Sequence, residues 1–122
     1  MTLVSRARQH RYRLKTPGRP NERAPKPEIV WATIESLPRD GHVLLESMDE
    51  QEVYLQAWLR PDGTYQLEVR EGSAATHLQT RSAFRERVAA AFTGWLEEHS
   101  GDGDSRWRED LQWKNISGDF SQ

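Results

Sequence analysis

The segment that decides the fold is VYLQAWLRPDGTYQLEVRE, residues 53–71. Apolar and polar side chains alternate on both sides of a central Pro61–Asp62–Gly63–Thr64. Successive side chains of a strand point to opposite faces, so the alternation predicts two strands with one buried face each. Pro61 suits the first central position of a turn and Gly63 the left-handed one. Together these features predict a tight antiparallel hairpin.

The two faces of this hairpin differ in chemistry. The predicted core face carries Val53, Leu55, Ala57, Leu59, Tyr65, Leu67 and Val69. The opposite face carries Tyr54, Gln56, Trp58, Gln66, Glu68 and Arg70. If Leu78 of the next predicted strand points inward, then His77, Gln79 and Arg81 join the polar face. One surface of the sheet is therefore expected to be polar and rich in aromatic and charged groups.

Further elements are expected on both sides of the hairpin. Residues 42–48 and 76–81 are rich in strand formers and are bounded by turn residues, which predicts two more strands. Before them, apolar residues recur at helical spacing and predict a helix that ends at Pro38: Ile29, Val30, Thr33, Ile34 and Leu37. After them, a second helix capped by Ser82 is expected to bury Phe84, Val88, Ala91, Phe92 and Trp95.

The end of the chain is expected to be irregular. Ser105 is expected to cap a short turn that carries Trp107 and Leu111, and residues 113–116 to add a last extended piece. We therefore predict an α+β domain at 28–116, with two layers and the order α-β-β-β-β-α. Its antiparallel sheet should have three to five strands, with the helices packed on one face. Residues 117–122 are expected to be a flexible tail.

Charge is unevenly distributed along the chain. Residues 1–27 hold eight of the 17 Lys and Arg and only one acid, whereas residues 28–122 hold nine bases and 18 acids. Residues 1–27 also contain four prolines and few apolar residues, so we expect a disordered basic arm. Such an arm can bind nucleic acid by releasing counterions, tether an acidic partner, or lie against its own acidic body.

Composition excludes several classes of function. The chain has no cysteine, which excludes thiolate metal sites and thiol nucleophiles, and a reducing cytoplasm is the expected compartment. No apolar run approaches the length of a membrane span. Neither a phosphate-binding glycine loop nor a histidine pair at metal-ligand spacing is present. We expect no catalytic residues, no cofactor and no metal. A small hydrolase-type enzyme that uses His77 and Glu68, with the imidazole as general base, is the third candidate function, after protein binding and nucleic-acid binding.

Trp58 is the aromatic residue of most functional interest. It lies opposite the Leu55–Leu59 face, beside Tyr54 and Arg70, a composition typical of interaction hot spots. The alternative, that the arm or the C-terminal segment packs over it, stays open. In contrast, Trp95 is expected in the core, and Trp107 and Trp113 at the end of the sheet.

Four motifs carry a resemblance over residues 65–113. They are Glu68–Val69–Arg70–Glu71–Gly72, His77–Leu78–Gln79, Val88–Ala89–Ala90–Ala91–Phe92 with Trp95, and Trp107–Arg108–Glu109–Asp110–Leu111–Gln112–Trp113. These residues resemble small uncharacterised actinobacterial proteins whose layout is similar to that of polymorphic-toxin immunity proteins. The order of helices and strands also resembles type III secretion-type chaperones. Both resemblances imply binding of another protein, and neither carries functional residues over to this chain.

The sequence thus leads us to expect non-enzymatic protein binding of an immunity or chaperone kind. The expected binding residues are Tyr54, Gln56, Trp58, Glu68, Arg70, His77 and Gln79. Because residues 28–122 are acidic, a basic partner such as a nuclease toxin or a secretion substrate is expected. Nucleic-acid binding through the arm is the alternative.

Overall fold

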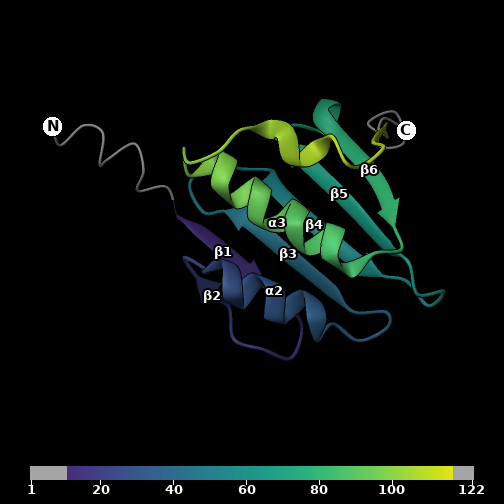
Figure 1. Cartoon of the computed structure of the whole chain (residues 1–122). Coiled ribbons are helices and arrows are strands. Elements are labelled where there is room, and N and C mark those ends of the chain that lie inside the picture. The colour runs from purple at the N-terminus through teal and green to yellow at the C-terminus, as the bar shows by residue number, and fades with distance from the viewer. Residues whose placement is uncertain (1–10, 117–122) are drawn as a thin grey trace, which may run out of the picture.

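A computed structural model describes residues 11–116 as one antiparallel sheet with two α-helices on one of its faces (Figure 1). The sheet has seven strands in the order β2-β1-β3-β4-β5-β6-β7. The strands are β1 (Tyr12–Lys15), β2 (Glu22–Arg23), β3 (His42–Ser47), β4 (Val53–Leu59), β5 (Tyr65–Glu71), β6 (His77–Ser82) and β7 (Lys114–Asn115). The helices are α2 (Pro27–Glu35) and α3 (Arg85–His99), with short 3-10 turns η1 (Ala74–Thr76) and η2 (Ser105–Arg108).

The central hairpin follows the alternation of the sequence. Leu59 pairs with Tyr65 and Val53 with Glu71 across β4 and β5. Gly63, in the turn, has a φ of 90°, which a glycine adopts without the strain that a Cβ would add. The predicted core residues of both strands are buried, so this prediction is confirmed.

The α+β class and the helices on one face are confirmed, but the number of strands is not. Two strands, β1 and β2, precede α2, and β7 follows α3, so neither the limit of five strands nor the order beginning with a helix is correct. The expected arm at 1–27 is also wrong for residues 11–27. Tyr12 and Leu14 are buried, and β1 pairs with β3. Residues 1–10 and the predicted tail at 117–122 lie outside the described residues.

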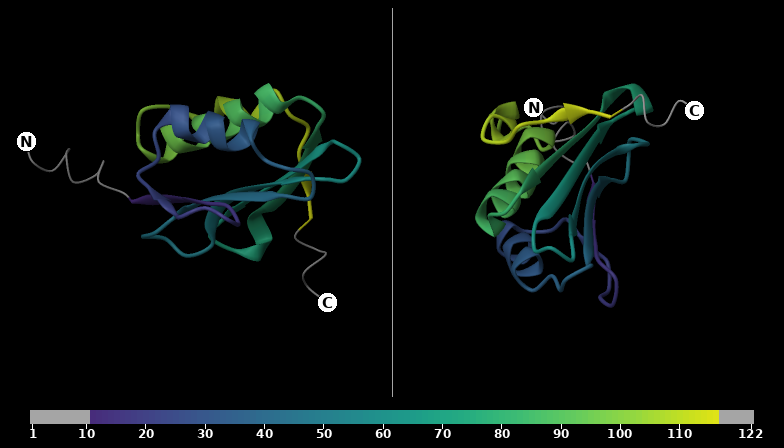
Figure 2. Two further views of the ribbon diagram at one scale, coloured as in Figure 1. Left: turned by 90° about the horizontal axis from the view of Figure 1, so that it is seen from below. Right: turned by 90° about the vertical axis from the view of Figure 1, so that its right-hand side faces the viewer.

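The core lies between the sheet and the helices (Figure 2). Trp95 of α3 is fully buried there, and the ring of Tyr12 meets it edge-on at 5.6 Å between centroids. The Tyr12 hydroxyl donates a hydrogen bond to the His99 carbonyl, which ties β1 to the end of α3. Two expected core residues are exposed instead: Ile29 at 41% and Phe84 at 59%.

Phe84 is exposed because α3 begins one residue later than its apolar pattern indicates. Phe84 is the N-cap residue, with extended backbone, so its side chain precedes the buried stripe. Ser82 belongs to β6 and accepts a hydrogen bond from the Phe84 amide, so it is not the N-cap. Similarly, Asp104 rather than Ser105 caps η2, through a hydrogen bond from the Arg106 amide. The expected last extended piece is confirmed by β7.

Neither of the helices that the structure describes in residues 11–116 is long and apolar enough to cross a bilayer.

Candidate binding face of the sheet

The strand register places the seven predicted site residues on one face of the sheet. The helices α2 and α3 lie on the other face (Figure 2). Cross-strand register brings them together. Tyr54 faces Arg70 and Gln56 faces Glu68 across β4 and β5. Arg70 then faces His77, and Glu68 faces Gln79, across β5 and β6. Among residues 11–116 no α-helix lies on this side, which we call the open face.

Glu68 is the centre of a hydrogen-bond network on the open face. It accepts from Gln66 at 2.9 Å and from Gln79 at 3.3 Å through Oε2, and it contacts His77 Nε2 at 2.7 Å through Oε1. Burial opposes ionisation of Glu68, but these hydrogen bonds outweigh it and hold the pKa of its carboxyl below the usual value. The carboxylate is thus stabilised in its charged form.

His77 is held from both sides. Its Nδ1 accepts a hydrogen bond of 2.9 Å from Arg70 Nε, so Nδ1 has no proton in this arrangement. The proton is then on Nε2, which donates to Glu68. The side chain is only 2% exposed. Neither ring nitrogen is available to take a proton from a substrate, so this geometry does not support a general base at His77.

Tyr54 contacts this network through the ring of His77. Its ring meets the His77 ring nearly at right angles, 6.1 Å between centroids. Burial, and more weakly the Glu68 carboxylate, raise the pKa of the Tyr54 hydroxyl above its usual value. Arg70, which contacts His77, also pairs with Glu52, the last residue of the turn between β3 and β4. Because His77, Arg70 and Glu68 hold one another, the orientation of these three side chains is fixed.

Trp58 is half-buried by neighbours from the same face. Its ring lies parallel to that of His42 at 5.7 Å, and Arg60 Cζ lies 4.8 Å from the ring centroid. The indole Nε1 donates to Asp40 Oδ1 at 2.9 Å. These contacts fix the orientation of the ring, so Trp58 is a preorganised aromatic on the surface.

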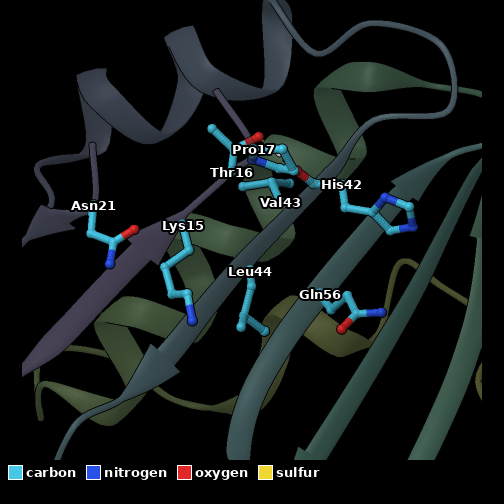
Figure 3. Close-up of a pocket in the computed structure, with 8 residues that line it drawn as sticks. All are labelled: Lys15, Thr16, Pro17, Asn21, His42, Val43, Leu44 and Gln56. Carbon is cyan, nitrogen blue, oxygen red and sulfur yellow. Dashed lines mark hydrogen bonds between the residues drawn. The ribbon is translucent and has the colours of Figure 1, made fainter. Parts of the chain in front are cut away.

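A hollow of about 400 Å³ opens on the same face beside Gln56 (Figure 3). Its lining includes Lys15, His42 and Leu44 from β1 and β3, and Thr16, Pro17 and Asn21 from the β1–β2 connection. Only Gln56 was among the residues expected from the sequence. The alternation of Tyr12 and Leu14 with Arg13 and Lys15 is the signal that predicts β1, and with it Lys15 on the open face.

Comparison with known proteins found no matching family model, no similar curated protein and no similar solved structure. The open face is therefore interpreted from its own chemistry.

Proposed function

We propose that this chain is a non-enzymatic protein-binding module, of an immunity-like or chaperone-like kind, that binds its partner through the open face. The observation that carries this proposal is the one-sided packing of a seven-stranded sheet. Both α-helices pack on one side (Figure 2), and the alternation of β4 and β5 places Trp58, Tyr54 and Arg70 on the other. Trp, Tyr and Arg are the residues most enriched in the energetically dominant parts of protein interfaces.

Rigidity of the face supports the same function. Trp58 is oriented by three neighbours, and His77 by Arg70 and Glu68. A partner that binds here orders few side chains, which lowers the entropic cost of association. A cytoplasmic location is part of this proposal, since a chain without cysteine needs no oxidising compartment.

The two other candidate functions have weaker support. An enzyme using His77 and Glu68 needs a free imidazole nitrogen, and both are engaged. Nucleic-acid binding by a basic arm relied on cations free to contact phosphate. Of these cations, Arg11 and Arg13 pair with Asp49 and Glu46 of the body, which leaves fewer of them free to contact phosphate.

Site-specific photocrosslinking tests the proposed function. A benzoylphenylalanine at Gln56 places the probe on the open face, and the same group at Glu35 places it on exposed α2 as the matched control. In the cells that normally make the chain, we expect a discrete protein adduct from position 56 and none from position 35. The proposal fails if position 56 gives no adduct, if both positions give the same adduct, or if the adduct is destroyed by nuclease.

A further inference from the structure

Charge is divided between the two faces of the molecule. The open-face positions of the strands carry six cations, Arg13, Lys15, Arg23, Arg70, Arg81 and Lys114, and two carboxylates, Glu46 and Glu68. The segments of the helical face, 27–35 and 85–112, carry nine acids and four bases. The turns beside the sheet add acids to the open face, since Asp40 accepts from Trp58 and Glu52 pairs with Arg70. The positive excess of the open face is therefore local, and there an acidic partner matches better than a basic one.

The excess of positive charge is concentrated at one corner. We define the basic corner as Arg13, Lys15 and Arg23, from β1 and β2. Glu46 forms ion pairs with two of these cations. Its Oε2 lies 2.7 Å from Arg13 Nη2 and 3.6 Å from Lys15 Nζ. Asp49, Glu50 and Glu52 line a neighbouring hollow together with Arg13 but without Lys15. The remaining positive charge of the corner therefore lies towards Lys15 and Arg23.

Arg23 adds a third charge, for which residues 11–116 supply no partner. It lies directly opposite Arg13 in the β1–β2 pair, and like charges in that position repel each other. Within residues 11–116 its guanidinium makes no hydrogen bond and no ion pair. An anion bound beside Arg13 and Arg23 would reduce this repulsion. Residues 11–116 supply no carboxylate that pairs with Arg23.

The hollow adjoins this corner. Lys15 belongs to both, and Leu44, its cross-strand neighbour, lines the hollow (Figure 3). Carbon atoms form most of the exposed lining, with the Lys15 ammonium and the Gln56 amide as polar groups at the sides. Cavities of this size accept an apolar side chain and use a few polar groups to orient it.

We propose, building on the protein-binding function above, that the partner presents an acidic polypeptide segment containing an apolar side chain. Its carboxylates bind the basic corner, and its apolar side chain enters the hollow beside Leu44 and Gln56. Arginine is well suited to the first contact, because its planar donors bind carboxylates in pairs. Carboxylates that neutralise Arg23 also remove its repulsion with Arg13.

Synthetic polymers test this chemistry without knowledge of the partner. The probes are poly-L-glutamate, a poly(Glu,Tyr) copolymer of similar length and a 20-nucleotide oligo-dT, each titrated into the full chain in 50 mM salt. We expect the copolymer to bind roughly tenfold more tightly than polyglutamate, because only the copolymer fills the hollow. We also expect both affinities to fall as salt increases, since the contacts are partly exposed ion pairs.

Three variants locate the binding site. Arg23→Glu should weaken both polypeptide probes by roughly tenfold or more, because it reverses a charge of the basic corner. Lys26→Glu makes the same change of net charge three residues away, at the exposed start of α2, and should leave both affinities nearly unchanged. Leu44→Gln keeps the charge and should remove the preference for the copolymer over polyglutamate. Thermal denaturation of each variant establishes that it is folded.

The outcomes separate this inference from the proposed function. No binding of either polypeptide, or equal weakening by Arg23→Glu and Lys26→Glu, overturns the acidic partner, while a protein crosslink at position 56 would still support the binding module. Tighter binding of oligo-dT than of the copolymer, lost in Arg23→Glu, would assign the corner to nucleic acid and overturn the inference.

Discussion

Gly94 of α3 lies so close to Trp107 that no side chain fits between them. An ideal Cβ on residue 94 would be 2.3 Å from Trp107 Cβ and 2.8 Å from its Cγ. This approach lets the segment after α3 pack against the helix, where Trp107 Nε1 donates to Glu98 Oε1 at 2.7 Å. Trp107 in turn meets Trp113 edge-on, at 5.9 Å between ring centroids.

Gly94→Ala should therefore destabilise the protein. Helix propensity alone predicts a gain of about 1 kcal/mol when alanine replaces glycine within a helix. Overlap with Trp107 opposes this gain, because overpacking costs about 1–3 kcal/mol or more. We expect a lower free energy of unfolding in urea than for the natural chain. In a Trp107→Gly background, which removes both the Cβ and the ring that a Cβ on residue 94 would meet, the same substitution should stabilise. A loss in both backgrounds would contradict the steric explanation.

Leu14→Ala tests whether β1 is part of the fold. Leu14 is buried in the core, so its truncation should lower the free energy of unfolding by about 2–4 kcal/mol. Lys15→Ala is the matched control on the open face and should change it by less than about 1 kcal/mol. Urea denaturation followed by circular dichroism measures both. Equal small effects would mean that residues 11–27 contribute little to stability.

Trp95→Ala and Trp58→Ala should differ strongly in stability. Trp95 is fully buried between Tyr12 and His99, so its loss should cost about 3–5 kcal/mol. Trp58 is half-buried and loses one hydrogen bond to Asp40, so a cost of about 1–2 kcal/mol is expected. Equal losses in thermal or urea unfolding would mean that the open face is packed as a second core.

Glu68→Gln should weaken the acid sensitivity of the fold. The pKa of Glu68 is lower in the folded than in the unfolded protein, where it is near the ordinary 4.5. Ionised Glu68 therefore adds stability that is fully present above about pH 4.5 and is lost as pH falls through the folded pKa. In Glu68→Gln this contribution is absent, so unfolding free energies at pH 7 and pH 3 should differ less than in the natural chain. An unchanged difference would show that the carboxylate does not contribute.

Several elements follow from local sequence alone. Because strand side chains alternate with a period of two, Val53–Leu59 and Tyr65–Glu71 could be assigned together with their buried and open faces. The shared face of Tyr54, Glu68 and His77 followed from that alternation. The same signal exists in Tyr12–Lys15, but it covers only four residues and is surrounded by prolines and cations. The prolines and cations around these four residues therefore favoured a disordered arm over a strand.

The sequence by itself determined the α+β class, the central hairpin and the identity of the open face, since these depend on local periodicity and on turns. Only the tertiary structure decided which side carries which charge. Arg13 and Arg23 face each other because of strand register, and Glu46 reaches Arg13 and Lys15 from a strand more than 30 residues later. Such pairings depend on how strands align in space, and a sum of charges along the chain does not contain that information.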